Sequence, residues 1–137
     1  MKLIVCIDDN NGLVFNNRRQ SMDVLLRRDI YEMTGESSLW MNYYSYTQFE
    51  QDGKCNIKVD DNFLDKAGED DYCFIENNGI TEYVPEVTQI IIYKWNRTYP
   101  YDTVLDFLPW DNGWSLAKQK EFMGNSHDKI TKEAYER

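Results

Sequence analysis

The stretch LIVCIDDNNG, residues Leu3 to Gly12, decides the fold of this chain. Its residues are apolar almost without interruption up to Asp8. Such a run is too short for a helix and too continuous for a half-exposed strand, so it predicts a strand covered on both faces in the middle of a sheet. The residues from Asp9 to Gly12 are typical of a turn and predict a loop at the carboxyl end of that strand. Open α/β sheets bind their ligands at this edge, and we expect a site to begin there.

Length and charge limit the classes of protein to which the chain can belong. Its 137 residues suit one domain, residues 1–137. Lys and Arg total 15 against 24 Asp and Glu, which gives a net charge of −9. This charge repels phosphate backbones and anionic lipid, so we expect no nucleic-acid partner and no membrane partner. No apolar run approaches the length of a membrane span, and the amino terminus lacks the apolar core of a signal peptide.

The three cysteines, Cys6, Cys55 and Cys73, predict a reducing compartment. Their number is odd, and no two of them have the C-x-x-C spacing. Cys6 and Cys73 lie within apolar, strand-like runs, which is typical of packed, reduced thiols. We therefore expect a cytoplasmic location.

The most clearly patterned helix follows Ser21, a natural N-cap residue. From Met22 the apolar residues recur three and four positions apart, and Gly35 follows in the position of a C-cap. Two further buried strands are predicted at residues 72–76 and 87–95. The remaining predictions are a strand at 38–42, a helix opened by a capping box at Ser45, a strand at 55–59, a short helix at 62–67 and an edge strand at 114–122. Residues 129–137 fit a helix by composition and a strand by alternation.

Several short motifs follow one another in a specific order. The first strand ends in I-D-x-N-N-G-L at residues 7–13, a helix ends in M-T-G at 33–35, and W-M-N at 40–42 precedes S-Y-T-Q-F at 45–49. The segment V-P-E-V-T-Q-I-I-I-Y at 84–93 has Asp102 nine residues after its Tyr. In this order the motifs resemble dihydrofolate reductase along most of the chain. The resemblance implies an α/β fold of three layers, α/β/α, with a mostly parallel central sheet and a C-terminal antiparallel hairpin, and so it implies a strand at 129–137.

The residues that carry the chemistry of that family differ here. The family has a carboxylate that protonates the pterin, eight residues before the Thr of its M-T-G-like helix end, and the matching residue is Leu26. The Gly and Arg of the family's phosphate-binding M-G-R-x-T turn correspond to Asn42 and Tyr43. Its paired glycines beside the nicotinamide correspond to Ile75 and Glu76. The resemblance therefore implies the scaffold without NADPH-dependent hydride transfer, and we expect no cofactor.

A weaker similarity links the chain to a group of short bacterial proteins that carry the label ribonuclease Z. Enzymes of that name bind two zinc ions through a cluster of His and Asp. This chain has a single histidine, His127. We therefore treat the label as a misassignment and expect no metal site.

The sharpest candidate for a site is the segment with Arg18, Arg19 and the predicted helix start at Ser21. Two guanidinium groups beside free backbone N–H groups form an anion pocket. Asp9 and Asn10 lie in the loop at the same edge of the predicted sheet. These five residues are the predicted ligand-binding residues.

A different arrangement of the same segment is more common in proteins. In it, Arg18 and Arg19 pair with nearby surface carboxylates such as Asp8, Asp9 or Asp23, and such pairs are weak. Both arrangements stay open at the level of the sequence.

Nucleophilic catalysis has a weak basis in the sequence. Ser126, His127 and Asp128 are adjacent, and adjacent residues do not converge on one reacting atom. The more common outcome is a hairpin in which the imidazole meets solvent or a carboxylate. Cys6 is the one plausible cysteine nucleophile on the central strand, where burial would keep it unreactive.

We therefore predict a non-catalytic protein of the reductase-like fold that binds a small anionic ligand or a protein partner. The alternative is an enzyme of unknown reaction on the same scaffold, either a hydrolase or nuclease of the kind that the ribonuclease Z label implies or a divergent reductase. Such an enzyme would use Asp8, Asp9, Cys6 or His127. The aromatic region from Tyr99 to Trp114 is the predicted contact surface for a partner or for a second copy in a homodimer.

Overall fold

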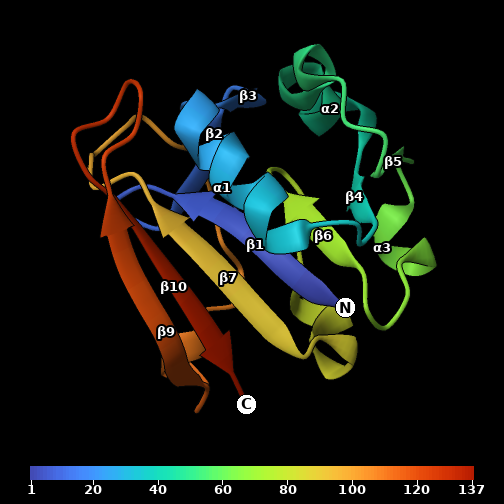
Figure 1. Cartoon of the computed structure of the whole chain (residues 1–137). Coiled ribbons are helices and arrows are strands. Elements are labelled where there is room, and N and C mark those ends of the chain that lie inside the picture. The colour runs from blue at the N-terminus through green and yellow to red at the C-terminus, as the bar shows by residue number, and fades with distance from the viewer.

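The first strand, β1 (Lys2–Ile7), occupies the middle of a seven-stranded sheet in the computed structural model, which describes residues 1–137 (Figure 1). The strand order is β5-β4-β6-β1-β7-β10-β9. The other strands of this sheet are β4 (Leu39–Met41), β5 (Ile57–Val59), β6 (Tyr72–Ile75), β7 (Gln89–Lys94), β9 (Ser115–Phe122) and β10 (Ile130–Glu136). The prediction that the first strand lies in the middle of the sheet is confirmed.

The five strands from β5 to β7 are parallel, and β1 has a neighbour on each side. Leu3 of β1 is in register with Cys73 of β6 and with Ile90 of β7. All three side chains are fully buried. The continuous apolar runs of these strands follow from burial on both faces, which a parallel sheet requires.

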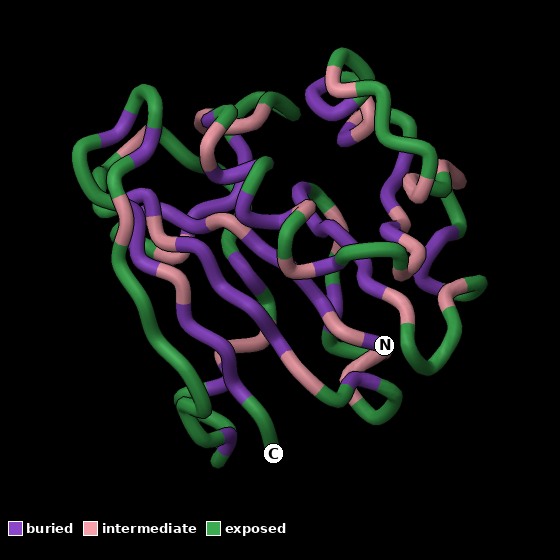
Figure 2. The backbone as a smooth tube through the Cα atoms, in the orientation of Figure 1, coloured by how far each residue is buried: buried purple, intermediate pink, exposed green.

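The chain ends in an antiparallel pair of strands. β10 pairs with β7 on one side and with β9 on the other, with Ala134 opposite Ile91 and opposite Lys118. Residues 130–136 are therefore a strand, as the resemblance implied and as their composition alone did not decide. β9 forms the edge of the sheet and is exposed along nearly its whole length (Figure 2).

The two faces of the sheet are covered differently. One face packs against the helices α1 (Val24–Thr34) and α2 (Tyr43–Phe49), which the 3-10 helix η1 (Glu50–Asp52) continues. The other face packs against short elements: α3 (Phe63–Lys66), the 3-10 helices η2 (Thr81–Glu86) and η3 (Pro109–Asp111), and a small sheet of β2 (Gly12–Phe15), β3 (Arg18–Arg19) and β8 (Thr103–Val104). The second covering layer is therefore made of short helices and short strands, whereas the predicted α/β/α arrangement has helices in this layer.

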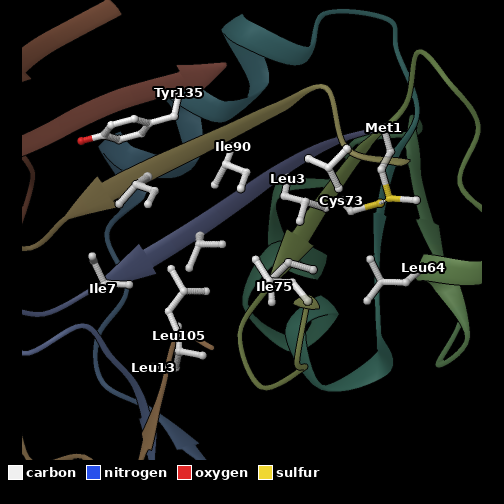
Figure 3. Packing of buried hydrophobic residues seen from close by; sticks show 14 of the residues in the cluster. Met1, Leu3, Ile7, Leu13, Leu64, Cys73, Ile75, Ile90, Leu105 and Tyr135 are labelled. Atoms are coloured by element: carbon white, nitrogen blue, oxygen red, sulfur yellow. Dashed lines mark hydrogen bonds between the residues drawn. The ribbon is translucent and has the colours of Figure 1, made fainter. Parts of the chain in front are cut away.

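The core on this second face joins the central sheet to the small one. Leu3 and Ile75 of the central sheet belong to the same buried cluster as Leu13 and Leu105 (Figure 3). Leu13 comes from β2 and Leu105 directly follows β8. This packing holds the small sheet against the central sheet, near the carboxyl end of β1. β2 begins there, directly after the loop at residues 8–11.

Two predicted helix starts are wrong by a few residues. α1 begins at Val24, and its N-cap is Asp23, whose Oδ1 accepts hydrogen bonds from the N–H groups of Leu25 and Leu26. Ser21 lies outside the helix. α2 begins at Tyr43 with Asn42 as its N-cap, so the predicted capping box at Ser45 does not form. Each segment contains two residues that suit an N-cap, and packing selects the earlier or the later one.

No helix in the structure combines the length and the apolar character that crossing a membrane requires.

Candidate functional site

A tight hairpin carries the two arginines of the predicted site. Asn16 and Asn17 both have positive φ values, 50° and 59°, which is the requirement of the hairpin turn that matches the twist of two antiparallel strands. The turn joins β2 to β3 and sets Arg18 opposite Phe15. Successive side chains of a strand project to opposite faces, and here Arg19 turns to Glu76 whereas Arg18 stays exposed. Both arginines still line one open cavity.

Arg19 is partly buried and has several polar partners. Its Nε lies 2.9 Å from Oε2 of Glu76, directly after β6, and its Nη2 donates to the carbonyl oxygen of Tyr44 at 2.9 Å. The guanidinium also lies over the Tyr44 ring, 4.5 Å from its centroid. Gln48 Nε2 donates to the same Glu76 oxygen at 3.0 Å. Arg19 therefore pairs with Glu76, and not with Asp8, Asp9 or Asp23.

The space behind this ion pair is closed. Leu26, Phe74, Ile75 and Trp95 are among the residues that enclose a cavity of about 10 Å³. Burial raises the pKa of the Cys6 thiol, which also faces this cavity, and the nearby carboxylate of Glu76 raises it further. A cavity of this size holds at most one water molecule. No substrate fits there.

An open cavity of about 520 Å³ lies on the outer side of the hairpin. Its lining residues are Phe15, Asn16, Arg18, Arg19, Gln20, Tyr99 and Pro100. Arg18 is exposed and takes part in none of the ion pairs of the structure. Phe15, which is 42% exposed, and Pro100 supply apolar walls. The cavity therefore combines a guanidinium without a carboxylate partner with flat apolar surfaces.

Asp9 and Asn10 do not line this cavity. Asp9 Oδ2 accepts from the Thr98 hydroxyl at 3.3 Å, and the Asn10 N–H donates to Asp8 Oδ1 at 2.9 Å. Asp8 is buried and also accepts from the N–H groups of Gly12 and Tyr99. The acidic end of β1 therefore organises the loop through backbone hydrogen bonds and lies apart from Arg18.

The single histidine belongs to a network that the sequence did not indicate. His127 is 3% exposed, its Nδ1 lies 3.0 Å from Oδ2 of Asp23, and its Nε2 lies 3.0 Å from the Ser21 hydroxyl. The Tyr99 hydroxyl is also 3.0 Å from Nε2, and the Trp95 ring stacks on the imidazole at 4.5 Å. Because a carboxylate only accepts hydrogen bonds, Nδ1 donates to Asp23 and Nε2 faces the two hydroxyl groups.

Asp23 is the centre of this network. Burial alone raises the pKa of its carboxyl, and hydrogen bonds from the Asn125 N–H, the His127 side chain and the Ser126 N–H outweigh that effect, so the pKa lies far below its ordinary value. Asp23 therefore stays ionised and ties the start of α1 to the loop at residues 124–127. The sequence prediction of a hairpin imidazole that meets a carboxylate agrees with this contact, although the adjacent Asp128 is not the partner.

Comparisons with known proteins identify the fold. No protein-family model matches the chain, and no curated protein matches its sequence. Among solved structures, the dihydrofolate reductase from Enterococcus faecalis complexed with NADP(H) and RAB-propyl is similar, with a TM-score of 0.69 and 11% sequence identity. The match covers 99% of this chain and 95% of that one. The chain has the fold of dihydrofolate reductase. At this identity the similarity extends to the fold alone.

The comparisons and the structure bear on three further points: the ribonuclease Z label, a metal site and a homodimer. The ribonuclease Z label has no support from a family model or from a curated protein. No group of three or more His, Cys, Asp or Glu side chains is arranged to hold a metal ion. Trp114 is buried and Trp110 is 36% exposed. A homodimer through the Tyr99–Trp114 region stays a prediction, as does the cytoplasmic location.

Proposed function

We propose that this protein is a non-catalytic member of the dihydrofolate reductase fold and that it binds a small anionic ligand in the open cavity beside Arg18. The observation that carries the proposal is the exposed guanidinium of Arg18, which has no carboxylate partner in a chain of net charge −9. Acidic groups are abundant on this chain, so a free arginine at a cavity is informative. A guanidinium binds carboxylate or phosphate groups through two parallel hydrogen bonds.

The walls of the cavity favour a ligand with a flat apolar body. Phe15 and Tyr99 present aromatic surface, and Pro100 lies beside them. The Oε1 atom of Gln20 is buried and accepts no hydrogen bond. When the Gln20 side chain turns this atom toward the cavity, a ligand N–H or O–H group can satisfy the acceptor and remove the cost of leaving it buried and unpaired. We infer an aromatic carboxylate or an aromatic phosphate that also carries a hydrogen-bond donor.

Reductase chemistry has no support at the closed cavity. In the family that the sequence resembles, a carboxylate protonates the substrate, and the matching residue here is Leu26, which is 3% exposed. The enclosed volume beside it is about 10 Å³. Leu26 cannot donate a proton, and the volume is too small for a nicotinamide ring.

A thermal-shift assay with a panel of nucleotides and aromatic carboxylates tests the proposal. A ligand that binds only the folded state stabilises that state by about 2.7 kcal/mol when the free ligand concentration is about 100 times the Kd. We expect at least one compound to raise the melting temperature of the wild-type protein, and Arg18→Ala to abolish that rise. Arg28→Ala is the matched control, because Arg28 is an exposed arginine on α1 that forms no ion pair. A panel without effect would remove the proposal, and turnover of dihydrofolate with NADPH would contradict its non-catalytic part.

A hydrolase is the second candidate, because Ser21, His127 and Asp23 have the distances of a catalytic triad. The Ser21 hydroxyl oxygen lies 3.0 Å from His127 Nε2, and His127 Nδ1 lies 3.0 Å from Asp23 Oδ2. In such a reaction the Ser21 hydroxyl would attack a carbonyl carbon while its proton moves to His127 Nε2. Ser21 does not line the open cavity, however, and His127 is enclosed by Trp95 and Tyr99.

A fluorophosphonate probe separates the two candidates. Attack by an activated serine would form a bond to phosphorus and release fluoride, which adds a fixed mass to the protein. We expect no labelling in the wild-type protein, because no cavity of substrate size reaches Ser21. Labelling that disappears in Ser21→Ala and in His127→Gln would replace the non-catalytic proposal with the hydrolase.

A further inference from the structure

A second cavity, of about 550 Å³, lies on the α1 side of the central sheet and has four lysines around it. They are Lys2, Lys118, Lys120 and Lys132. Ile91 and Ala134 form part of its apolar lining. Lys2 begins β1, whereas the hairpin with Arg18 follows the other end of that strand. The two cavities therefore lie at opposite ends of the parallel strands.

The register of the sheet brings these lysines together. Lys120 of β9 stands directly opposite Lys132 of β10, and Lys118 stands opposite Ala134. Side chains two positions apart on a strand lie on the same face, so Lys118 and Lys120 share the face of Lys132. Lys2 reaches the same face from β1.

Asp29 is the only carboxylate that forms ion pairs with these four lysines. Asp29 of α1 contacts Lys120 Nζ and lies 2.9 Å from Lys132 Nζ. Lys2 and Lys118 form no ion pair with any carboxylate of the chain. Like charges directly opposite each other on two strands are destabilising. The unbound protein therefore carries excess positive charge here, on a chain with a net charge of −9.

Protection of the sheet edge explains part of this arrangement. Lysines on an edge strand oppose pairing with other sheets, which accounts for Lys118 and Lys120 on β9. The same reason does not apply to Lys132 on the inner strand β10 or to Lys2 on the central strand. Four lysines from three strands instead line one cavity.

We infer that this cavity binds an organic phosphate, with the apolar part of the ligand against Ile91 and Ala134 and the phosphate between the lysine ammonium groups. Phosphate is the anion favoured by the arrangement, since its several oxygens accept hydrogen bonds from more than one ammonium group at once. An apolar body is favoured because Ile91 and Ala134 supply apolar surface beside the lysines. This site is independent of the ligand proposed for Arg18.

Calorimetric titration with 1-naphthyl phosphate at low salt tests the inference. We expect saturable binding of one molecule per chain in this cavity, separate from any molecule bound beside Arg18, and a Kd for it at least about tenfold higher in the Lys2→Gln, Lys118→Gln double variant, because each change removes a charge-assisted hydrogen bond. Lys2 and Lys118 have no ion pair to lose, so the variant should keep its fold, which its urea unfolding midpoint checks. Lys129→Gln is the matched control, because Lys129 precedes β10 in the same hairpin and pairs with Glu121 instead.

Two further titrations assign the binding to this cavity. Neutral 1-naphthol should bind at least about tenfold more weakly than its phosphate, and Arg18→Ala should leave the Kd of 1-naphthyl phosphate unchanged. Absence of binding to the wild-type protein would overturn the inference, as would an equal Kd for the folded double variant. Loss of binding in Arg18→Ala alone would assign the phosphate to the hairpin cavity and overturn this site while leaving the proposed function intact.

Discussion

The guanidinium of Arg19 and the carboxylate of Glu76, 57 residues apart in the chain, form an ion pair with 2.9 Å between Nε and Oε2. Their side chains are 19% and 8% exposed. The pair joins β3 to the carboxyl end of β6 and closes the space behind it. Side chains of the chain itself fill that space and leave a cavity of about 10 Å³.

Removing one member of this pair should destabilise the protein. Glu76→Gln leaves the Arg19 guanidinium with a neutral partner in a largely buried position, and we expect a loss of about 2 kcal/mol in the free energy of unfolding. Urea denaturation measures it. Glu121→Gln, which removes an exposed pair with Lys129, should cost less than about 0.5 kcal/mol. Equal losses in the free energy of unfolding would show that the Arg19–Glu76 pair stabilises the protein no more than an exposed pair does.

Stability should fall in acid, and Asp23 should account for part of the fall. Hydrogen bonds in the folded state outweigh the effect of burial and hold the pKa of Asp23 below its unfolded value. The stabilisation is therefore complete above the unfolded pKa of about 4 and is lost as the pH falls toward the folded pKa. Urea midpoints at pH 7 and pH 3 should differ less in Asp23→Asn than in the wild-type protein. An unchanged difference between the two midpoints would contradict the role of Asp23.

Gly12 should not tolerate a side chain. A Cβ atom at this position would lie 2.8 Å from Cβ of Tyr101, which is fixed next to the backbone, and 2.9 Å from Oδ1 of Asp8, which two backbone N–H groups hold in place. We expect Gly12→Ala to cost about 2 kcal/mol, which is typical of overpacking. Gly68→Ala is the control, because its nearest contact, to the Asp71 carboxylate, is 3.3 Å. A thermal melt in which both variants match the wild-type protein would refute the prediction.

The three thiols should react at very different rates. Cys55 is exposed, whereas burial raises the pKa of Cys6 and raises that of Cys73 to about 12. Because the thiolate is the reactive form, a disulfide reagent at pH 8 should modify one thiol per native chain at least about a hundredfold faster than the other two. In urea all three should react together. Two fast thiols in the native protein would mean that the small cavity beside Cys6 opens to solvent.

The sequence predicted the framework well because its signals are local. An apolar run such as Leu3 to Ile7 encodes burial on both faces by itself, and it correctly indicated the central strand. That Leu26 stands where the resembled family has a carboxylate was also visible without a structure. Local signals were less exact at helix starts, since Ser21 and Asp23 both suit an N-cap and only the contacts of Asp23 with residues 125–127 select it.

Tertiary structure decided every pairing between distant charges. The sequence predicted Arg18 and Arg19 at one site after β1, but the tertiary structure pairs Arg19 with Glu76 and leaves Arg18 exposed in the open cavity that both arginines line. Likewise, the lysines of β1, β9 and β10 lie together only because of strand register. The sequence shows which charged side chains each segment carries. Which of those side chains come into contact depends on how segments far apart in the chain pack against each other.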